Sequence, residues 1–75
     1  MKLIDSGYLL KASYPFEGRE RYDLSNGNCY LQKNQHSYYG IGQGAIVKIF
    51  DSENRLYADW GNGPTVEVIP APKKG

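Results

Sequence analysis

The chain has 75 residues, with nine Lys and Arg against eight Asp and Glu and a formal net charge of +1. This length suits one small domain, which buries about 60–65% of the surface of its unfolded chain. The balanced charge argues against a generic polyanion-binding protein, which normally carries a clear basic excess.

The cysteine content and the apolar pattern bear on the compartment. The single cysteine, Cys29, excludes an internal disulfide bond and indicates a reducing environment. No apolar stretch is long enough for the core of a signal peptide or for a membrane span. We therefore expect a cytoplasmic protein. Tyrosine is the one compositional excess, at seven residues, and tyrosine favours both strands and interfaces.

The N-terminal part predicts one strand between two turns. Residues 1–5 predict a short extended lead-in, and Ser6-Gly7 is a turn signal. Residues 8–14 predict a strand with Tyr and Leu on one side, because Gly7 and Pro15 lie too close together for a stable helix. The stretch from Pro15 to Gly18 predicts a turn or an open loop.

A hairpin is predicted next, with Asn26-Gly27 at its tip as a two-residue turn. The resulting register gives an apolar face made of Tyr22, Leu24, Cys29 and Leu31.

Residues 34–44, with the sequence NQHSYYGIGQG, have no regular pattern and predict the longest loop. Such loops in small domains are usually functional or partly disordered. The glycines from Gly40 to Gly44 invite comparison with phosphate-binding loops, but those need a strand before and a helix after the glycines. Here a strand follows and no lysine lies inside, so we expect an entry to the next strand with a bulge or a close backbone approach.

Residues 45–69 predict a meander of three antiparallel strands, around which the rest of the chain is organised. Residues 51–54 suit a type I turn with Asn54 at positive φ, and Asn62-Gly63 is a strong hairpin signal. The predicted register gives one face with Ile46, Lys48, Phe50, Leu56, Ala58 and Trp60, and another with Val47, Ile49, Tyr57, Asp59, Val66 and Val68. Both faces are substantially apolar, so we expect both to be covered in part, by the rest of the chain or by a partner.

The strand count predicts an all-β fold class: a small five- to six-stranded antiparallel barrel or two packed orthogonal sheets. Residues 1–69 are expected to form a single β domain, followed by a Pro/Lys-rich C-terminal tail over 70–75. The strand that ends in Trp-Gly-Asn-Gly before a Val-x-Val strand resembles SH3-like barrels of the KOW and Tudor type. This resemblance covers Ala45 to Ile69, about a third of the chain, and implies a fold without implying a ligand.

Residue types that carry catalysis or bind metals are scarce. One histidine and one cysteine cannot form a zinc site, and no pair has ligand spacing. Cys29 and His36 could pair as nucleophile and base, but Cys29 lies on a predicted apolar face and His36 in a polar loop. The carboxylates are scattered singly. We therefore expect no enzyme, no cofactor and no metal.

Aromatic residues are the candidates for binding. Tyr38 and Tyr39 are adjacent, so one can anchor the loop while the other faces solvent, or both can pack inside. Trp60 either covers the open end of the barrel or forms an exposed patch with Phe50 and Ile46, flanked by Lys48 and Arg55. Nearby polar groups would be Gln43, Asp59 and Asn62 if the loop folds over the meander.

The expected function is a non-catalytic protein-interaction module with an accessory, regulatory or inhibitory role. The residues expected to contact another protein are Tyr38, Tyr39, Gln43, Trp60, Arg55 and Lys48. The alternative is a small barrel that binds single-stranded nucleic acid, with the aromatic residues stacked on bases and Lys33, Lys48 and Arg55 on phosphates. Exposed strand edges could also support strand addition or a homodimer.

Overall fold

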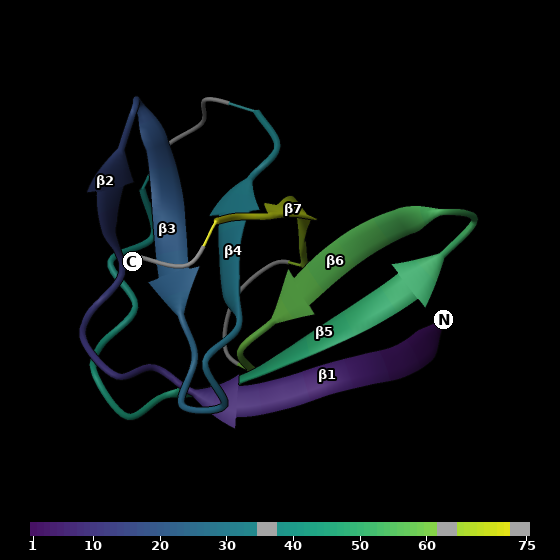
Figure 1. Ribbon diagram of the computed structural model, residues 1–75, viewed down its shortest axis with the longest axis horizontal. Coiled ribbons are helices and arrows are strands. Elements are labelled where there is room, and N and C mark those ends of the chain that lie inside the picture. Colours follow the sequence, from purple (N-terminus) through teal and green to yellow (C-terminus); the bar gives the residue numbers. More distant parts are fainter. Residues whose placement is uncertain (35–37, 62–64, 73–75) are drawn as a thin grey trace.

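The computed structural model describes residues 1–34, 38–61 and 65–72. In this part of the chain seven antiparallel strands form one sheet and no helix is present, which confirms the predicted all-β class (Figure 1). The strands are β1 (Lys2–Tyr8), β2 (Tyr14–Phe16), β3 (Arg19–Asp23), β4 (Cys29–Gln32), β5 (Ile46–Ser52), β6 (Arg55–Asp59) and β7 (Val66–Pro70). The number of strands is therefore greater than the five or six expected.

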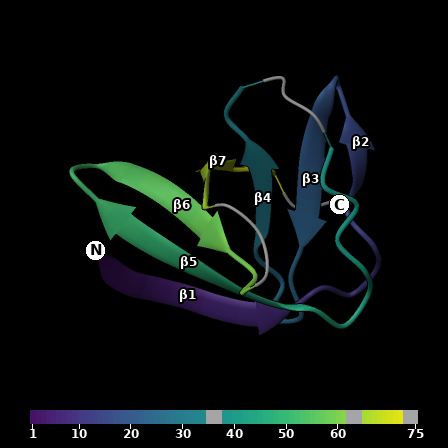
Figure 2. The ribbon, with the colours of Figure 1, turned by 180° about the vertical axis from the view of Figure 1, so that it is seen from behind.

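The strand order in the sheet is β1-β5-β6-β7-β4-β3-β2. Strands β1, β5 and β6 form one wall, which crosses the wall of β2, β3 and β4 steeply, with β7 between them (Figures 1 and 2). The sheet is not closed by a continuous ladder. However, Leu9 bridges Leu24, the Leu10 N–H donates to the Asp23 carbonyl at 3.0 Å, and the Ser25 N–H donates to the Tyr8 carbonyl at 2.8 Å. The chain after β1 thus lies against the end of β3.

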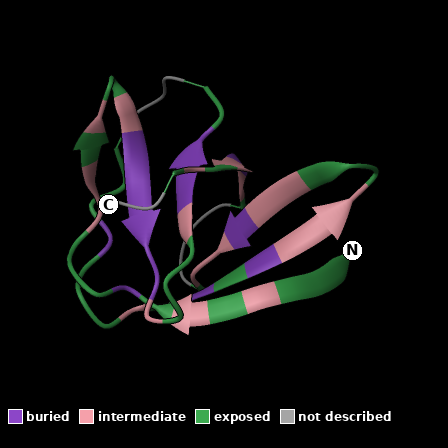
Figure 3. Ribbon diagram, viewed as in Figure 1, coloured by how far each residue is buried: buried purple, intermediate pink, exposed green. Residues whose placement is uncertain are grey.

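The hydrophobic core fills the space between the two walls. Figure 3 shows β3 mostly buried and β1 mostly exposed. Burial of these apolar side chains is the main favourable contribution to folding. The buried cluster consists of Leu9, Tyr22, Leu24, Tyr30, Ile41, Val47, Ile49, Ala58 and Val68.

The predicted turn at Ser6-Gly7 is wrong, because Lys2–Tyr8 is one strand that pairs with β5. The Asp5 carboxylate accepts hydrogen bonds from Tyr30 Oη at 2.7 Å and from Asn28 Nδ2 at 2.9 Å, which holds this stretch extended against the β3–β4 hairpin. Gly7 allows a close approach rather than a turn, since a Cβ there would lie 3.1 Å from Ser25 Oγ and 3.3 Å from Leu24 Cβ.

The predicted strand over residues 8–14 is also wrong. The described chain has a bridge at Leu9 and then an irregular stretch, and the next strand is the short Tyr14–Phe16. The turn predicted between Pro15 and Gly18 is confined to Glu17-Gly18, both at positive φ, so that Phe16 pairs with Arg19. Two residues with positive φ make the tight turn that suits a twisted hairpin.

The register predicted for β5 and β6 is wrong by one residue. The loop is the two-residue turn Glu53-Asn54, with φ of 53° and 65°, and Ser52 pairs with Arg55. The positive φ of Asn54 is confirmed, but the extra bulge residue is not present. A one-residue slip exchanges the two faces of a strand. Consequently β6 turns Leu56, Ala58 and the adjoining Trp60 toward the core, whereas Tyr57 lies opposite Phe50.

The register predicted for β3 and β4 is wrong by one residue in the other direction. The Leu24 N–H donates to the Asn28 carbonyl, so the loop has three residues and ends at Gly27 with φ of 91°. Tyr22 therefore pairs with Tyr30, and Cys29 does not share a face with Tyr22 and Leu24.

The ladder between β6 and β7 also differs from the prediction by one residue. Ala58 pairs with Val66 rather than with Glu67. The hairpin turn predicted at Asn62-Gly63 lies outside the described residues. Beyond the ladder, β7 ends at Pro70, where the tail is predicted to begin, and the Ala71 N–H donates to the Cys29 carbonyl at 2.9 Å.

The β5–β6 turn allows a first prediction. Glu53 holds a left-handed φ that side chains other than Gly, Asn and Asp adopt at a cost. Replacing Glu53-Asn54 with Asn-Gly should raise the free energy of unfolding by about 1 kcal/mol, measured by urea denaturation. Asn54→Val should lower it by a similar amount. Equal stability of all three proteins would contradict this account of the turn.

Candidate functional site

The loop that carries Tyr38 and Tyr39 is attached to the core by a buried carboxylate. Glu20 on β3 is 1% exposed. Its two oxygens accept the backbone N–H groups of Tyr39 and Gly40, each at 3.0 Å. Ser13 Oγ donates to the same carboxylate at 2.6 Å. Hydrogen bonds to an ionised acceptor are about twice as strong as neutral ones, so the loop backbone is fixed at these two residues.

Two further side chains complete the surroundings of the Glu20 carboxylate. Tyr22 Oη donates to it at 3.0 Å, and Gln32 Nε2 lies 3.5 Å from the same oxygen and 3.4 Å from Tyr22 Oη. Burial, and then the charge of Glu20, raises the pKa of Tyr22, so its hydroxyl stays protonated and donates. The buried negative charge is thus stabilised by hydrogen-bond donors.

The following residues of the loop are fixed by Ser13. The Ser13 N–H donates to the Ile41 carbonyl at 2.9 Å, and the Ile41 N–H donates to Ser13 Oγ at 2.8 Å. The Ile41 side chain belongs to the core cluster. The loop is therefore attached by backbone bonds and by Ile41, rather than by a buried tyrosine.

Tyr38 and Tyr39 are both exposed, by 48% and 41% of their surface. Neither predicted arrangement, one anchored tyrosine or two packed ones, is observed. The Tyr39 ring instead lies 5.2 Å from the Trp60 ring, at an interplanar angle of 50°. The Trp60 ring is 6.2 Å from the ring of Tyr22 and packs on the core. We call Tyr38, Tyr39 and Trp60 the aromatic surface.

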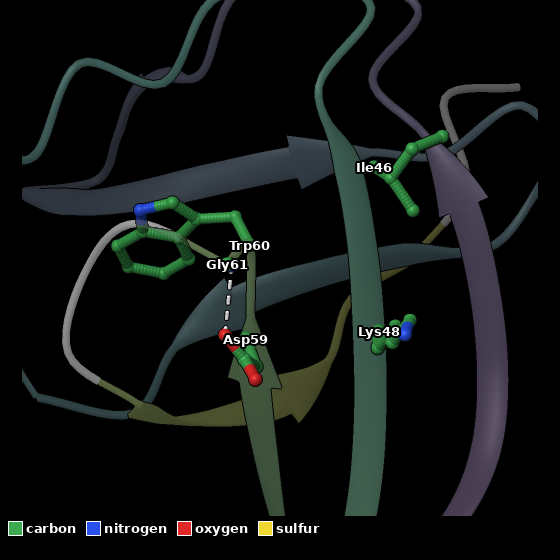
Figure 4. Close-up of a pocket in the computed structure, with 5 residues that line it drawn as sticks. All are labelled: Ile46, Lys48, Asp59, Trp60 and Gly61. Atoms are coloured by element: carbon green, nitrogen blue, oxygen red, sulfur yellow. Dashed lines mark hydrogen bonds between the residues drawn. The ribbon is translucent and has the colours of Figure 1, made fainter.

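An open hollow of about 250 Å³ lies beside Trp60, where β5 and β6 separate (Figure 4). The Gly61 N–H donates to Asp59 Oδ1 at 2.8 Å, which fixes the chain at the end of β6. Small-molecule sites are usually deeper and occupy about 300–1,000 Å³, so this hollow suits a single side chain. Its lining residues are Ile46, Lys48, Asp59, Trp60 and Gly61.

The predicted patch of Trp60 with Phe50 and Ile46 is only partly present. Trp60 turns toward the core, whereas Phe50 lies on the opposite side of the sheet, because the register differs from the predicted one. Ile46 and Lys48 meet Trp60 only at the hollow. The structure therefore brings Lys48 close to Trp60, although the two do not share one face.

Two predicted contact residues lie apart from the hollow. Arg55 begins β6 at the tip of the β5–β6 hairpin, paired with Ser52. Gln43 is exposed in the turn before β5 and does not line the hollow. Of the predicted polar rim, Asp59 does line it, and Asn62 lies outside the described residues.

The chemistry available at Cys29 is limited. Its thiol is half-buried, and burial, together with Asp23, raises its pKa, which lowers the fraction of nucleophilic thiolate. His36, the one residue that could act as its base, lies outside the described residues. Among the described residues there is no group of three or more His, Cys, Asp or Glu side chains that could hold a metal ion.

Several cations are already paired with carboxylates. Lys33 Nζ lies 3.1 Å from Glu67, Arg21 Nε lies 2.9 Å from Asp23, and Lys11 Nζ lies 3.8 Å from Asp23. A nucleic-acid surface needs cations gathered on one side and free to meet phosphates. In the structure Lys33 is therefore paired with Glu67, although its side chain stays 47% exposed.

Sequence reasoning missed Glu20, the residue on which the loop depends. A signal for it was present: Glu20, Tyr22 and Leu24 alternate along one strand, so the glutamate lies on the same face as two core residues. A charged residue at such a position is almost never buried without partners. The polar groups that satisfy it come from distant parts of the chain, which the pattern could not show.

The comparisons with known proteins do not identify a family for this chain. Within the described part of the chain, no helix is long and apolar enough to cross a membrane. Comparison with models of protein families finds no match, and neither does comparison with curated proteins or with solved structures.

Proposed function

We propose that the protein is a non-catalytic interaction module that binds another protein through the aromatic surface. The observation that supports this is the combination of exposed rings and fixed backbone: Tyr38 and Tyr39 face solvent on a loop held by Glu20. Aromatic side chains dominate the energetically important positions of protein interfaces. A loop that is already ordered loses less conformational entropy on binding.

Trp60 contributes to the proposed binding role by contacting the ring of Tyr39. Its contact with Tyr22 and with the core holds the indole in place, and the Tyr39 ring lies against it. The Tyr39 ring therefore contacts Trp60 while 41% of the residue surface stays exposed to a partner. Such a supported tyrosine provides contact area at low entropic cost. By analogy with other small chains, the proposed role is accessory, regulatory or inhibitory.

The test is a quantitative capture experiment from the source cell, with the immobilised protein as bait. The variant with Tyr38→Ser and Tyr39→Ser should recover its specific partner at least about tenfold less well than wild type, the loss typical of an aromatic hot spot. The matched control is Tyr8→Ser, because Tyr8 is equally exposed at 48% but lies at the end of β1. Equal recovery by the loop variant and the control would contradict the proposal.

Binding of single-stranded nucleic acid is the second candidate and has a separate test. The ion pairs of Lys33, Arg21 and Lys11 weaken its electrostatic basis. We expect a labelled oligonucleotide to show no tight binding at low salt. Tight binding with a steep salt dependence, lost in the Lys48→Ala variant, would replace the protein-binding proposal with this one.

A further inference from the structure

The side of β5 and β6 that points away from the core is an exposed, partly apolar surface. The register places Lys48 opposite Asp59 and Phe50 opposite Tyr57, and Ile46 precedes them at the start of β5. Ile46 is 54% exposed, although the residue after it is fully buried. We call this surface the outer face; its members are Ile46, Lys48, Phe50, Tyr57 and Asp59.

The outer face is more apolar than a solvated sheet face should be. An antiparallel sheet with one side in water normally alternates apolar and polar residues. Here Phe50 and Tyr57, both half-buried, are cross-strand neighbours on the side away from the core. On β1, which lies beside β5, Leu3 pairs with Phe50 and Tyr8 with Ile46, and both are about half exposed. Apolar residues gathered on one side of a sheet in this way offer a surface for a partner.

The outer face carries one positive and one negative side chain next to each other. Lys48 and Asp59 are cross-strand neighbours, yet the ion pairs formed among the described residues do not include one between them. In Figure 4 the two side chains extend from adjacent strands, and Asp59 is bonded to the Gly61 N–H. One cation and one anion therefore stand side by side on the surface, each able to meet an opposite charge.

We propose that the outer face binds a second copy of this chain. A two-fold axis parallel to the strands, midway between β5 and β6, places β5 of one copy over β6 of the other. Lys48 then meets Asp59 of the second copy, and Phe50 meets Tyr57 of the second copy; each contact occurs twice. Such a self-complementary contact is the usual geometry of homodimers, and sheets pack face to face with nearly aligned strands.

The hollow beside Trp60 fits the same arrangement. Continuing the register by two residues past Lys48 and Asp59 brings Ile46 level with Gly61. In the dimer, Ile46 is therefore directed toward the Gly61 side of the hollow in the second copy, which has room for one side chain. An exposed aliphatic side chain and a shallow recess thus complement each other, twice per dimer. Trp60 lines this hollow, but Tyr38 and Tyr39, the residues substituted to test the aromatic surface, do not.

The size of the outer face indicates weak association. Two strands of about six residues cover roughly 10 Å by 20 Å, or about 200 Å² per copy, against about 800 Å² per partner in stable interfaces. We therefore expect a reversible dimer with a dissociation constant on the order of 10⁻⁴ M. Its charged centre makes it weaker at high salt.

The test is sedimentation equilibrium of the full chain over roughly 20 μM to 1 mM, with circular dichroism to check folding. Lys48→Asp and Asp59→Lys should each weaken dimerisation at least about tenfold, because each places two pairs of like charges in the contact. An equimolar mixture of these two variants should dimerise about as well as wild type, since every opposed pair is again of opposite sign. Native mass spectrometry identifies the mixed dimer by its mass.

The apolar contacts are tested by Ile46→Ser, which should also weaken the dimer about tenfold. Its control is Leu10→Ser, at a residue of similar exposure outside the outer face. A protein that stays monomeric at 1 mM overturns the proposal. Dimerisation that neither charge variant alters overturns it too, and points to pairing along the β1 edge. Failure of the mixture to recover dimerisation likewise overturns it, because charge complementarity is then not the cause.

Discussion

Glu20→Gln is expected to lower the free energy of unfolding by about 3 kcal/mol. The glutamine side chain has one acceptor oxygen, and its NH₂ group faces donors where Glu20 had a second oxygen. The N–H of either Tyr39 or Gly40 then loses its acceptor at a side chain that is only 1% exposed. Since 1 kcal/mol corresponds to roughly 4–8 °C in a domain of this size, the melting temperature should fall by about 15 °C.

The control for this prediction is Glu17→Gln, the same chemical change at an exposed residue of the β2–β3 turn. It should change stability by less than about 0.5 kcal/mol. The fluorescence of Trp60 provides a second measurement, because Tyr39 lies against its ring. If Glu20→Gln unfolds no more easily than Glu17→Gln and leaves the emission unchanged, the loop is not held by Glu20.

Arg21→Met should destabilise the protein by about 3 kcal/mol. Arg21 is 2% exposed, its Nε donates to Asp23 at 2.9 Å, and its guanidinium also donates to the Pro72 carbonyl. Removing the cation leaves Asp23 with Tyr14 Oη at 3.0 Å, the Cys29 thiol and a distant Lys11, so a largely buried charge loses its main partner. The exposed Arg55 supplies the control: Arg55→Met should be nearly neutral by urea denaturation.

The pH dependence of stability gives a second measurement on the same pair. Burial raises the pKa of Asp23, but hydrogen bonds, led by that from Arg21, outweigh it and leave the pKa below its usual value. A carboxyl with a lowered folded-state pKa stabilises the protein above its unfolded pKa, and this contribution disappears as pH falls through the folded pKa. Arg21→Met should therefore shift acid unfolding to higher pH. Adding Asp23→Leu should restore most of the lost stability, and no restoration would contradict the pairing argument.

The fold class could be predicted from the sequence because short-range signals determine it. Alternating apolar residues between Gly, Asn and Pro signals predict strands, and Asn54 does hold a positive φ. Register could not be predicted, because it depends on loop length to a single residue. The β5–β6 loop has two residues and the β3–β4 loop ends at Gly27 as its third, each one residue from the length expected. An error of one residue in loop length exchanges the predicted faces of β6 relative to β5. In the structure Trp60 therefore lies on the core side.

The candidate site was predictable only in its exposed part. Tyr38 and Tyr39 stand out as adjacent aromatic residues in a loop, and their role in binding stays a prediction. The support beneath them was not visible, because Ser13, Glu20 and Gln32 come from three separate segments and meet only in the folded chain. Tertiary hydrogen bonds of this kind leave little trace in local sequence patterns. The strand β1 was missed for the same reason, since it pairs with β5.

The pairing of β1 with β5 has a consequence for the order of events at the ribosome. Lys2 pairs with Asp51, so β1 has no ladder partner until β5, about fifty residues later in the chain, has also emerged. Closing so long a loop makes this a late and slow step in folding. During translation the nascent β1, with exposed Leu3 and Ile4, is available to chaperones or to other unfinished chains.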